Sequence, residues 1–414
     1  MGMVNSPAYQ YSRKLRLVSL VSYALPVLFF LKQYAYGFGN IYLTGAVLLC
    51  LLCMMVSRSV VIRMDSSRRA LFFFTLFYVG RLALTGVAGT SVVNRAYFMT
   101  LLQYLASAFV IIYLIDYLDE DKAYKIWKIL CIIVGIAVLY QSFQIYVLGH
   151  KVYPITVLPP KVSNVMTDVW HRANSRPVAF FTEPSCIAAF LMPVLFLAQK
   201  RNETALAVFL TIILLLCGST TALVEIAFLW LVMIISRDIH KQLKILLIVL
   251  FLLLVFTVFA LPVFNATVDK LLYEVSGESA NFASRVTNGW KIFDAYNFPT
   301  KILGASNIDL SAYIRNHASL AMLASQTRTA LGYNYFFNTA QRIGLTSGIV
   351  GMAAYAWMLV VFFRSLKKDM RPYFWIMVME LFYAWNFYTS NYFMIQMFTV
   401  LMVGGARRRY PEES

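Results

Sequence analysis

The residues best suited to do chemistry are an arginine and a glutamate that share one short stretch, RPVAFFTEPS, in a chain that is 60% hydrophobic. Arg176 stands before Pro177, which disfavours helix in the preceding residue, so we expect an extended segment there. Glu183 stands before Pro184, and proline suits the first position of a helix, so Glu183 should lie at the positive end of a long apolar helix. An arginine fork can grip a phosphate, and a carboxylate can take a proton from a hydroxyl. Two interpretations stay open: the two charges only neutralise each other or cap the helix, or each serves a reaction.

The elements that must position these side chains are apolar runs long enough to cross a membrane. Only 13% of the 414 residues are charged, and several runs reach the ~20 residues that cover a hydrocarbon core of ~30 Å. Backbone groups within lipid must be satisfied internally, which favours helices. We therefore predict an all-α polytopic membrane protein, a single helical domain over residues 1–414 with about twelve transmembrane helices. The predicted spans are 16–35, 40–56, 70–90, 97–117, 126–148, 184–199, 204–218, 220–236, 243–264, 343–363, 373–388 and 391–405.

Basic residues mark alternate loops between these spans, which places both termini in the cytoplasm by the positive-inside rule. Much of the net charge of +17 then lies on an inner rim that faces anionic lipid, so no nucleic-acid partner is needed to explain it. Two loops on the opposite face are long, at residues 149–183 and 265–342. Amphipathic stretches in the second loop are expected to form short helices at the membrane interface.

The long outer loops carry more arginine than orientation requires, because long loops cross the membrane largely regardless of their charge. The chain contains no P-loop and no GxGxxG, so an arginine-lined outer site favours a substrate that brings its own phosphate, such as a lipid-linked diphosphate sugar. Preorganised arginines can stabilise a departing diphosphate without a metal, so we expect no metal and no cofactor. The alternative is that each arginine binds a lipid headgroup or a nearby carboxylate. The arginines are Arg172, Arg176, Arg285, Arg315, Arg328 and Arg342.

Charged residues inside the predicted spans are further candidates. Arg81, Glu225 and Glu380 lie in spans, where ionisable residues are functional candidates, although Arg81 could instead pair with a glutamate inside the bundle. The five cysteines all fall in or beside apolar runs, so no disulfide framework is predicted. Cys50 and Cys53 form a C-x-x-C within a span, and packing is favoured there over a redox or zinc pair.

Four stretches, in order, resemble elements of the O-antigen polymerase and O-antigen ligase family of bacterial membrane glycosyltransferases. RPVAFFTEPSCIAAFLMPVL is similar to the arginine–aromatic–E-P-S element that opens a helix, in the form found in polymerases. LLLCGSTTALVEIAFLWL is similar to a serine- and threonine-rich start of a long span. SRVTNGWKIFDAYNFPTKILGASN resembles an Arg…Trp…Leu-Gly-x-Gly element, and GYNYFFNTAQRIGLTSGIVGMAAY resembles an H-N-x-x-L…G-x-x-G entry to a late span.

The chain departs from the family pattern at four positions. Thr220 stands where many relatives have an arginine, so that role is not carried over. Ala305 and Ser306 replace the usual x-Gly, which keeps the turn only in part. Tyr333 stands where ligases commonly have histidine. This last departure, with the glutamate of the first element, favours a polymerase over a ligase.

The resemblance implies a polymerase of O-antigen or another surface polysaccharide, such as that of lipopolysaccharide. It would be a GT-C-like enzyme that joins undecaprenyl diphosphate-linked oligosaccharides by metal-independent, inverting transfer. It implies a multi-pass protein of the bacterial inner membrane whose active site faces the periplasm. Its partners would be the lipid-linked donor and acceptor, membrane lipids and a chain-length regulator protein. The alternatives are an O-antigen ligase, a flippase or transporter of lipid-linked oligosaccharide, and an acyltransferase.

The site residues follow from the chemistry of the side chains together with the resemblance. Arg176 and Arg285 would grip the diphosphate and stabilise the leaving group, and Glu183 would be the general base. Substrate contacts of second rank are expected from Arg172, Tyr333, Asn334 and Arg342.

Overall fold

The fold is described from a computed structural model. It describes residues 7–34, 41–57, 64–87, 95–158, 173–236, 289–305, 338–383 and 391–404, with residues 62, 171, 248 and 249 and a few residues between 310 and 320. In these residues the chain is all-α, and the extended backbone forms a single isolated bridge between Val152 and Asn174. Three helices in the described residues are long and apolar enough to cross a membrane, at Phe98–Tyr117, Glu120–Tyr146 and Thr339–Ser365.

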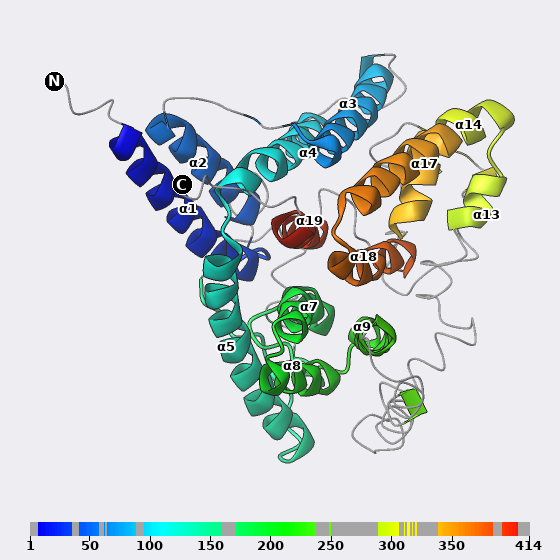
Figure 1. Ribbon diagram of the computed structural model, residues 1–414. Helices are drawn as coiled ribbons and strands as arrows, with labels where there is room; N and C mark the ends of the chain where they lie inside the picture. The colour runs from blue at the N-terminus through cyan, green and yellow to red at the C-terminus, as the bar shows by residue number, and fades with distance from the viewer. Residues whose placement is uncertain are drawn as a thin grey trace. The chain divides into compact units, whose positions relative to one another are not determined.

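The chain folds into two compact units, each built from two separate stretches of sequence. Unit 1 comprises Met1–Val60 and Tyr117–Leu271, and unit 2 comprises Val61–Asp116 and Leu272–Ser414. Described helices of unit 1 are α1 (Pro7–Phe30), α2 (Ile41–Ser57), α5 (Glu120–Tyr146), α7 (Pro184–Lys200), α8 (Thr204–Leu216) and α9 (Thr220–Ser236) (Figure 1). Those of unit 2 are α3 (Ser66–Val87), α4 (Arg95–Leu114), α13 (Gly289–Asp294), α14 (Phe298–Leu303), α17 (Thr339–Ser365), α18 (Arg371–Tyr383) and α19 (Asn391–Gly404).

Helix α7 is the core of unit 1. Its side chains from Ile187 to Gln199 are buried except that of Ala189, which is partly buried. Helix α5 packs against it, where the Trp127 indole donates a hydrogen bond of 3.1 Å to the carbonyl of Phe190. Because α7 is apolar nearly all round, burial inside a bundle is its expected position.

A cluster of ion pairs joins the start of α5 to the turn between α7 and α8. Arg201 Nη2 lies 3.0 Å from Glu120 and 2.6 Å from Asp121, and Lys128 pairs with Glu203. Burial acts to lower the pKa of Arg201, but hydrogen bonds to Asp121 and Glu120 outweigh it and raise that pKa. The positive-inside pattern assigns both of these helix ends to the cytoplasmic face.

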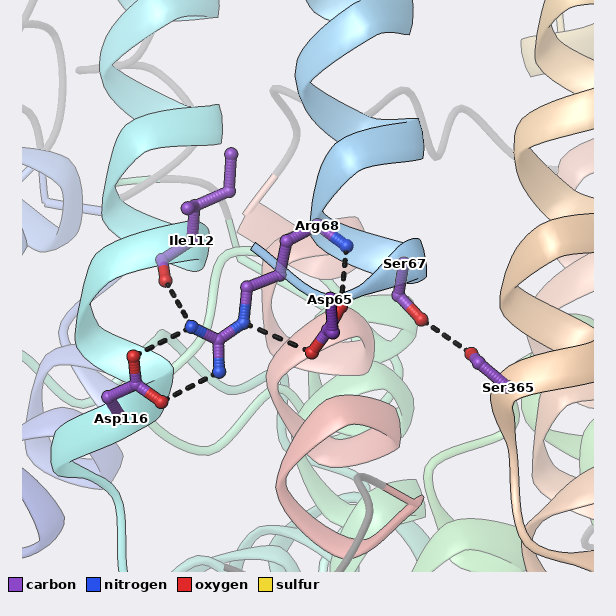
Figure 2. A network of polar contacts seen from close by, with 6 residues as sticks. All are labelled: Asp65, Ser67, Arg68, Ile112, Asp116 and Ser365. Atoms are coloured by element: carbon purple, nitrogen blue, oxygen red, sulfur yellow. Dashed lines mark hydrogen bonds and ion pairs between the residues drawn. The ribbon is translucent and has the colours of Figure 1, made fainter. Parts of the chain in front are cut away.

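Arg68 and Ser67, at the start of α3, together join three helix ends of unit 2 (Figure 2). Arg68, 6% exposed, donates to both carboxylate oxygens of Asp116 at 2.7 Å, and to the carbonyl of Ile112. Its Nε lies 3.3 Å from Asp65, at the start of α3. Beside it, Ser67 shares a hydrogen bond with Ser365 at the end of α17. A bidentate pair of this kind satisfies a charge that would be costly to bury alone.

The predicted spans and the observed helices agree closely in position. Eleven of the twelve predicted spans coincide with helices, and the twelfth, 243–264, lies outside the described residues except at 248 and 249. The first helix begins at Pro7, well before the predicted residue 16. The structure supports an all-α protein with helices that can cross a membrane, but it does not support the number twelve. Helix α8, for example, has 13 residues. A crossing at 1.5 Å per residue needs about 20.

The cysteines are buried and free, as the absence of a disulfide framework predicts. All five lie in described residues and none forms a disulfide. Cys50 and Cys53 are 1% and 0% exposed within α2, where they serve as packing residues.

Candidate functional site

Arg176 is fixed in unit 1 by a contact with the turn between α8 and α9. Its Nη1 donates a hydrogen bond of 3.0 Å to the carbonyl of Gly218, just beyond the end of α8. Tyr146, at the end of α5, donates at 3.4 Å to the carbonyl of Leu216 and interacts electrostatically with Arg176. A cation at a helix C-terminus is favoured by the helix dipole. The structure thus brings together the first two stretches of the family resemblance, which lie 42 positions apart at this contact.

Between Arg176 and Glu183 the chain makes a tight turn, which corrects the expectation of an extended segment. Phe181 N donates to the carbonyl of Val178 at 2.8 Å, and Ala179 has a φ of 48°, a value rare outside glycine. The turn lies in the interior of unit 1, since Val178, Ala179 and Phe181 are fully buried. Burying an irregular backbone segment requires partners for its polar groups.

Those partners are two glutamines. Gln141 Oε1 accepts hydrogen bonds from the amides of Val178 and Ala179 at 2.8 and 2.6 Å. Gln33 bonds Phe180 and Thr182 on the other side of the turn. The sequence analysis missed both residues. The signal was a glutamine at the end of the apolar run 16–35 and another within the run 126–148, because an uncharged amide in an apolar stretch must find a partner.

Glu183 lies at the N-cap position of α7 with an extended backbone, at φ −145° and ψ 151°, and Pro184 occupies the first turn as predicted. Its carboxylate is exposed and forms no capping hydrogen bond, although the Ser185 hydroxyl donates to it at 3.3 Å. In the described part of the chain no ion pair joins Glu183 to Arg176. The structure therefore shows neither an ion pair between Glu183 and Arg176 nor a capping hydrogen bond from the Glu183 side chain.

In unit 2, Arg342 occupies the first turn of α17. That turn is held by a capping box between Asn338 and Gln341. The guanidinium of Arg342 interacts electrostatically with Tyr78 of α3 and Tyr104 of α4. Two phenols, a cation and a helix N-terminus together form a buried polar patch, in which Tyr78 and Tyr104 are 1% and 5% exposed. Tyr78 and Tyr104 were missed by the sequence analysis, and only their position within apolar runs could have indicated them.

The last two stretches of the family resemblance meet in unit 2, where α14 ends against a kink in α17. Gly348 breaks the helical backbone of α17 at φ 63° and ψ −161°. A Cβ at Gly304 would lie 2.3 Å from Ser347 N, and a Cβ at Gly348 would lie 2.3 Å from the carbonyl oxygen of Ile302. Only glycine allows so close a backbone contact in this conformation. Ala305, which replaces a residue of the family pattern, donates its amide to the carbonyl of Leu345 at 2.9 Å.

The charged residues of the predicted spans have partners. Arg81 donates two hydrogen bonds, of 3.2 and 2.9 Å, to the carbonyl of Leu303 at the end of α14. Gln396 donates to the carboxylate of Glu380, which is 3% exposed. Glu225 is 1% exposed within α9. Arg81 therefore serves at least to hold α14, a role that the sequence did not indicate.

The other predicted site residues lie outside the described part of the chain. They are Arg172, Arg285, Tyr333 and Asn334, together with the outer-loop arginines Arg315 and Arg328. Arg176 and Glu183 belong to unit 1 and Arg342 to unit 2.

Comparisons with known proteins do not extend this picture. No family model matches the chain, and no curated protein matches it. The function is therefore argued from the residues and their geometry.

Proposed function

We propose that the protein is a membrane glycosyltransferase that polymerises lipid-linked oligosaccharide repeat units. The observation that carries this proposal is the buried, hydrogen-bonded turn between Arg176 and Glu183. It presents a cation and an exposed carboxylate that do not pair with each other. One group can hold a phosphate while the other takes a proton, which is the division of roles that glycosyl transfer from a diphosphate donor requires.

In the proposed reaction an acceptor hydroxyl attacks the anomeric carbon of the donor. The bond from that carbon to the diphosphate oxygen breaks, and the proton of the hydroxyl passes to the Glu183 carboxylate. The diphosphate leaves with its electron pair, and Arg176 stabilises the negative charge. Arg176 uses one N–H on Gly218, and a guanidinium has five, so donors remain for phosphate. A single displacement inverts the configuration of the sugar.

The family resemblance gives roles to the remaining predicted residues. Arg285 would bind diphosphate, and Arg172, Tyr333, Asn334 and Arg342 would contact substrate. The substrates would be an undecaprenyl diphosphate-linked donor and acceptor, and a chain-length regulator protein would be a further partner. Without a bound metal the arginines alone would supply the charge stabilisation.

The proposed location is the bacterial inner membrane, with about twelve spans, cytoplasmic termini and the site on the periplasmic face. The contacts within each unit support this topology. The cluster at Arg68 joins only helix ends that the positive-inside pattern assigns to the cytoplasm. The contact of Arg176 with Gly218 joins only segments assigned to the opposite face.

The test is to incubate the purified full chain with one defined lipid-linked repeat unit and to separate the products on a gel. A ladder of products that persists in excess chelator is expected. Transfer of the glycan only to an added lipid acceptor would instead indicate a ligase. Movement of the lipid-linked sugar across vesicles without any product would indicate a transporter and overturn the proposal.

A further inference from the structure

We infer that Gln141 and Gln33 are positioning residues that set where Arg176 and Glu183 stand during the reaction. This inference rests on the proposed function. Neither glutamine needs to touch substrate, because both act on the backbone of the turn that separates the two charged groups.

Gln141 is an interior clamp. It is 2% exposed in α5, and its amide serves three backbone groups of two different segments. Oε1 accepts from Val178 N at 2.8 Å and Ala179 N at 2.6 Å, while Nε2 donates to the carbonyl of Tyr153 at 2.9 Å. Val178 is two residues from Arg176, so this clamp fixes the arginine end of the turn.

Gln33 holds the glutamate end of the same turn. Just beyond α1, its Nε2 donates to the carbonyl of Phe180 at 3.1 Å. Its Oε1 accepts from the amide of Thr182 at 3.1 Å and from the Thr182 hydroxyl at 3.4 Å. Thr182 immediately precedes Glu183, so Gln33 controls the backbone from which the carboxylate projects.

The turn needs both clamps because its backbone lies outside the described helices and strands, so its amides have no regular hydrogen-bond partners. A left-handed residue such as Ala179, at φ 48°, is strained and persists only where its surroundings impose it. The segment 151–157 adds further support, since Ile155 N donates to the carbonyl of Ala179 at 2.7 Å. With the amide clamps removed, the turn can relax and the two charged groups can shift relative to each other. A shift of about 1 Å in a reacting group costs about 100-fold in rate.

The variants Gln141→Ala and Gln33→Ala are expected to lower kcat by about 10- to 100-fold with a smaller change in KM. Gln141→Glu keeps an oxygen acceptor for both amides and should recover part of the lost rate. Gln144→Ala is the matched control. It removes the same residue type from the same helix, where Gln144 contacts His150 and not the turn. It should leave kcat unchanged.

The experiment combines ladder formation with hydrogen exchange of the peptide that covers residues 176–183. Exchange there should accelerate in both clamp variants and stay slow in Gln144→Ala. If Gln141→Ala and Gln33→Ala form the ladder of products at the wild-type rate, the positioning role is overturned and the proposed function is not. Unchanged exchange in those variants would overturn the positioning role as well. Absence of any ladder from the wild type would instead overturn the proposed function, and the positioning role with it.

Discussion

The two units bring distant stretches of sequence together by different means. In unit 1, Arg176 reaches the end of α8 through a side chain, and the turn beside it is held by glutamine amides. In unit 2, the end of α14 meets α17 at a close contact of backbone with backbone, at Gly304 and Gly348. Side-chain contacts can be lost one at a time while the fold persists. Backbone contacts of this closeness leave no room for any side chain.

This difference predicts that substitutions at these contacts have different consequences in the two units. Unit 1 combines a rigid buried turn with charged groups that remain available at its ends, which suits chemistry. Unit 2 combines the backbone contact of Gly304 with Gly348 and arginines that join separate helices. Arg68 binds Asp116, and Arg81 binds the carbonyl of Leu303. The comparison predicts that substitutions at the polar contacts of unit 1 change activity, whereas substitutions at the backbone contact in unit 2 change stability.

The largest effect is expected at the glycine crossing, which is the close backbone contact of Gly304 with Gly348. Gly304→Ala and Gly348→Ala each place a Cβ 2.3 Å from backbone atoms, at φ values of 73° and 63° that alanine adopts poorly. We expect each to lower the free energy of unfolding by at least about 3 kcal/mol. The thermal unfolding midpoint in detergent and the yield of folded protein would both fall.

Gly80→Ala in α3 is the matched control for the crossing. A Cβ there meets nothing within 4 Å, and alanine favours helix over glycine, so stability should stay equal or rise by up to about 1 kcal/mol. If Gly304→Ala unfolds at the same temperature as Gly80→Ala, the close backbone contact is not what holds unit 2 together.

The second effect is the loss of activity in unit 1 without a loss of fold. Arg176→Ala and Glu183→Gln remove one hydrogen bond to Gly218 and one exposed carboxylate, so insertion and unfolding temperature should remain near wild type. Ladder formation should fall by about 100-fold or more, because each removes a group used in the transition state. Long products at the wild-type rate from either variant would contradict the site.

Arg176→Lys sharpens this second test. A lysine keeps the charge but cannot reproduce the planar fork that binds a phosphate bidentately. Recovery of only part of the rate would support a fork on the diphosphate. Complete recovery would reduce the role of Arg176 to its charge.

The fold could be predicted further from the sequence than the site. Apolar periodicity and basic loops indicated the helices, because the hydrophobic pattern of a span is a local property. Pro184 indicated the start of α7 at the observed residue. The span predicted at 204–218 was already shorter than a crossing requires, and the structure shortens it to the 13 residues of α8, because a boundary depends on how the ends pack.

The charged residues of the candidate site could be predicted from their type, but the residues that hold them in place could not. Arg176 and Glu183 are conspicuous charges beside prolines, whereas Gln141 is one amide in an apolar helix whose three partners lie on loops. Those partners depend on tertiary structure, which spacing along the chain does not encode. The turn at Ala179 was missed for the same reason, since alanine gives no sign of a positive φ.

The smallest effect is expected from the phenol of Tyr78, and it tests whether a single hydroxyl contact in unit 2 contributes less than the backbone contact at Gly304 and Gly348. Its hydroxyl lies 3.2 Å from Thr346 Oγ1, which also donates to the carbonyl of Arg342 at 2.6 Å. Tyr78→Phe keeps the ring that packs against Phe74 and Tyr104. The loss should be about 1 kcal/mol of unfolding free energy, because Thr346 keeps a second partner. Thermal unfolding measured beside Tyr140→Phe, which alters an exposed phenol of α5, gives the baseline.

A loss of unfolding free energy as large as that of Gly304→Ala would show that this hydroxyl contact holds unit 2 together as strongly as the backbone contact does. A large fall in ladder formation without a fall in stability would instead assign the patch of Tyr78 and Arg342 to substrate.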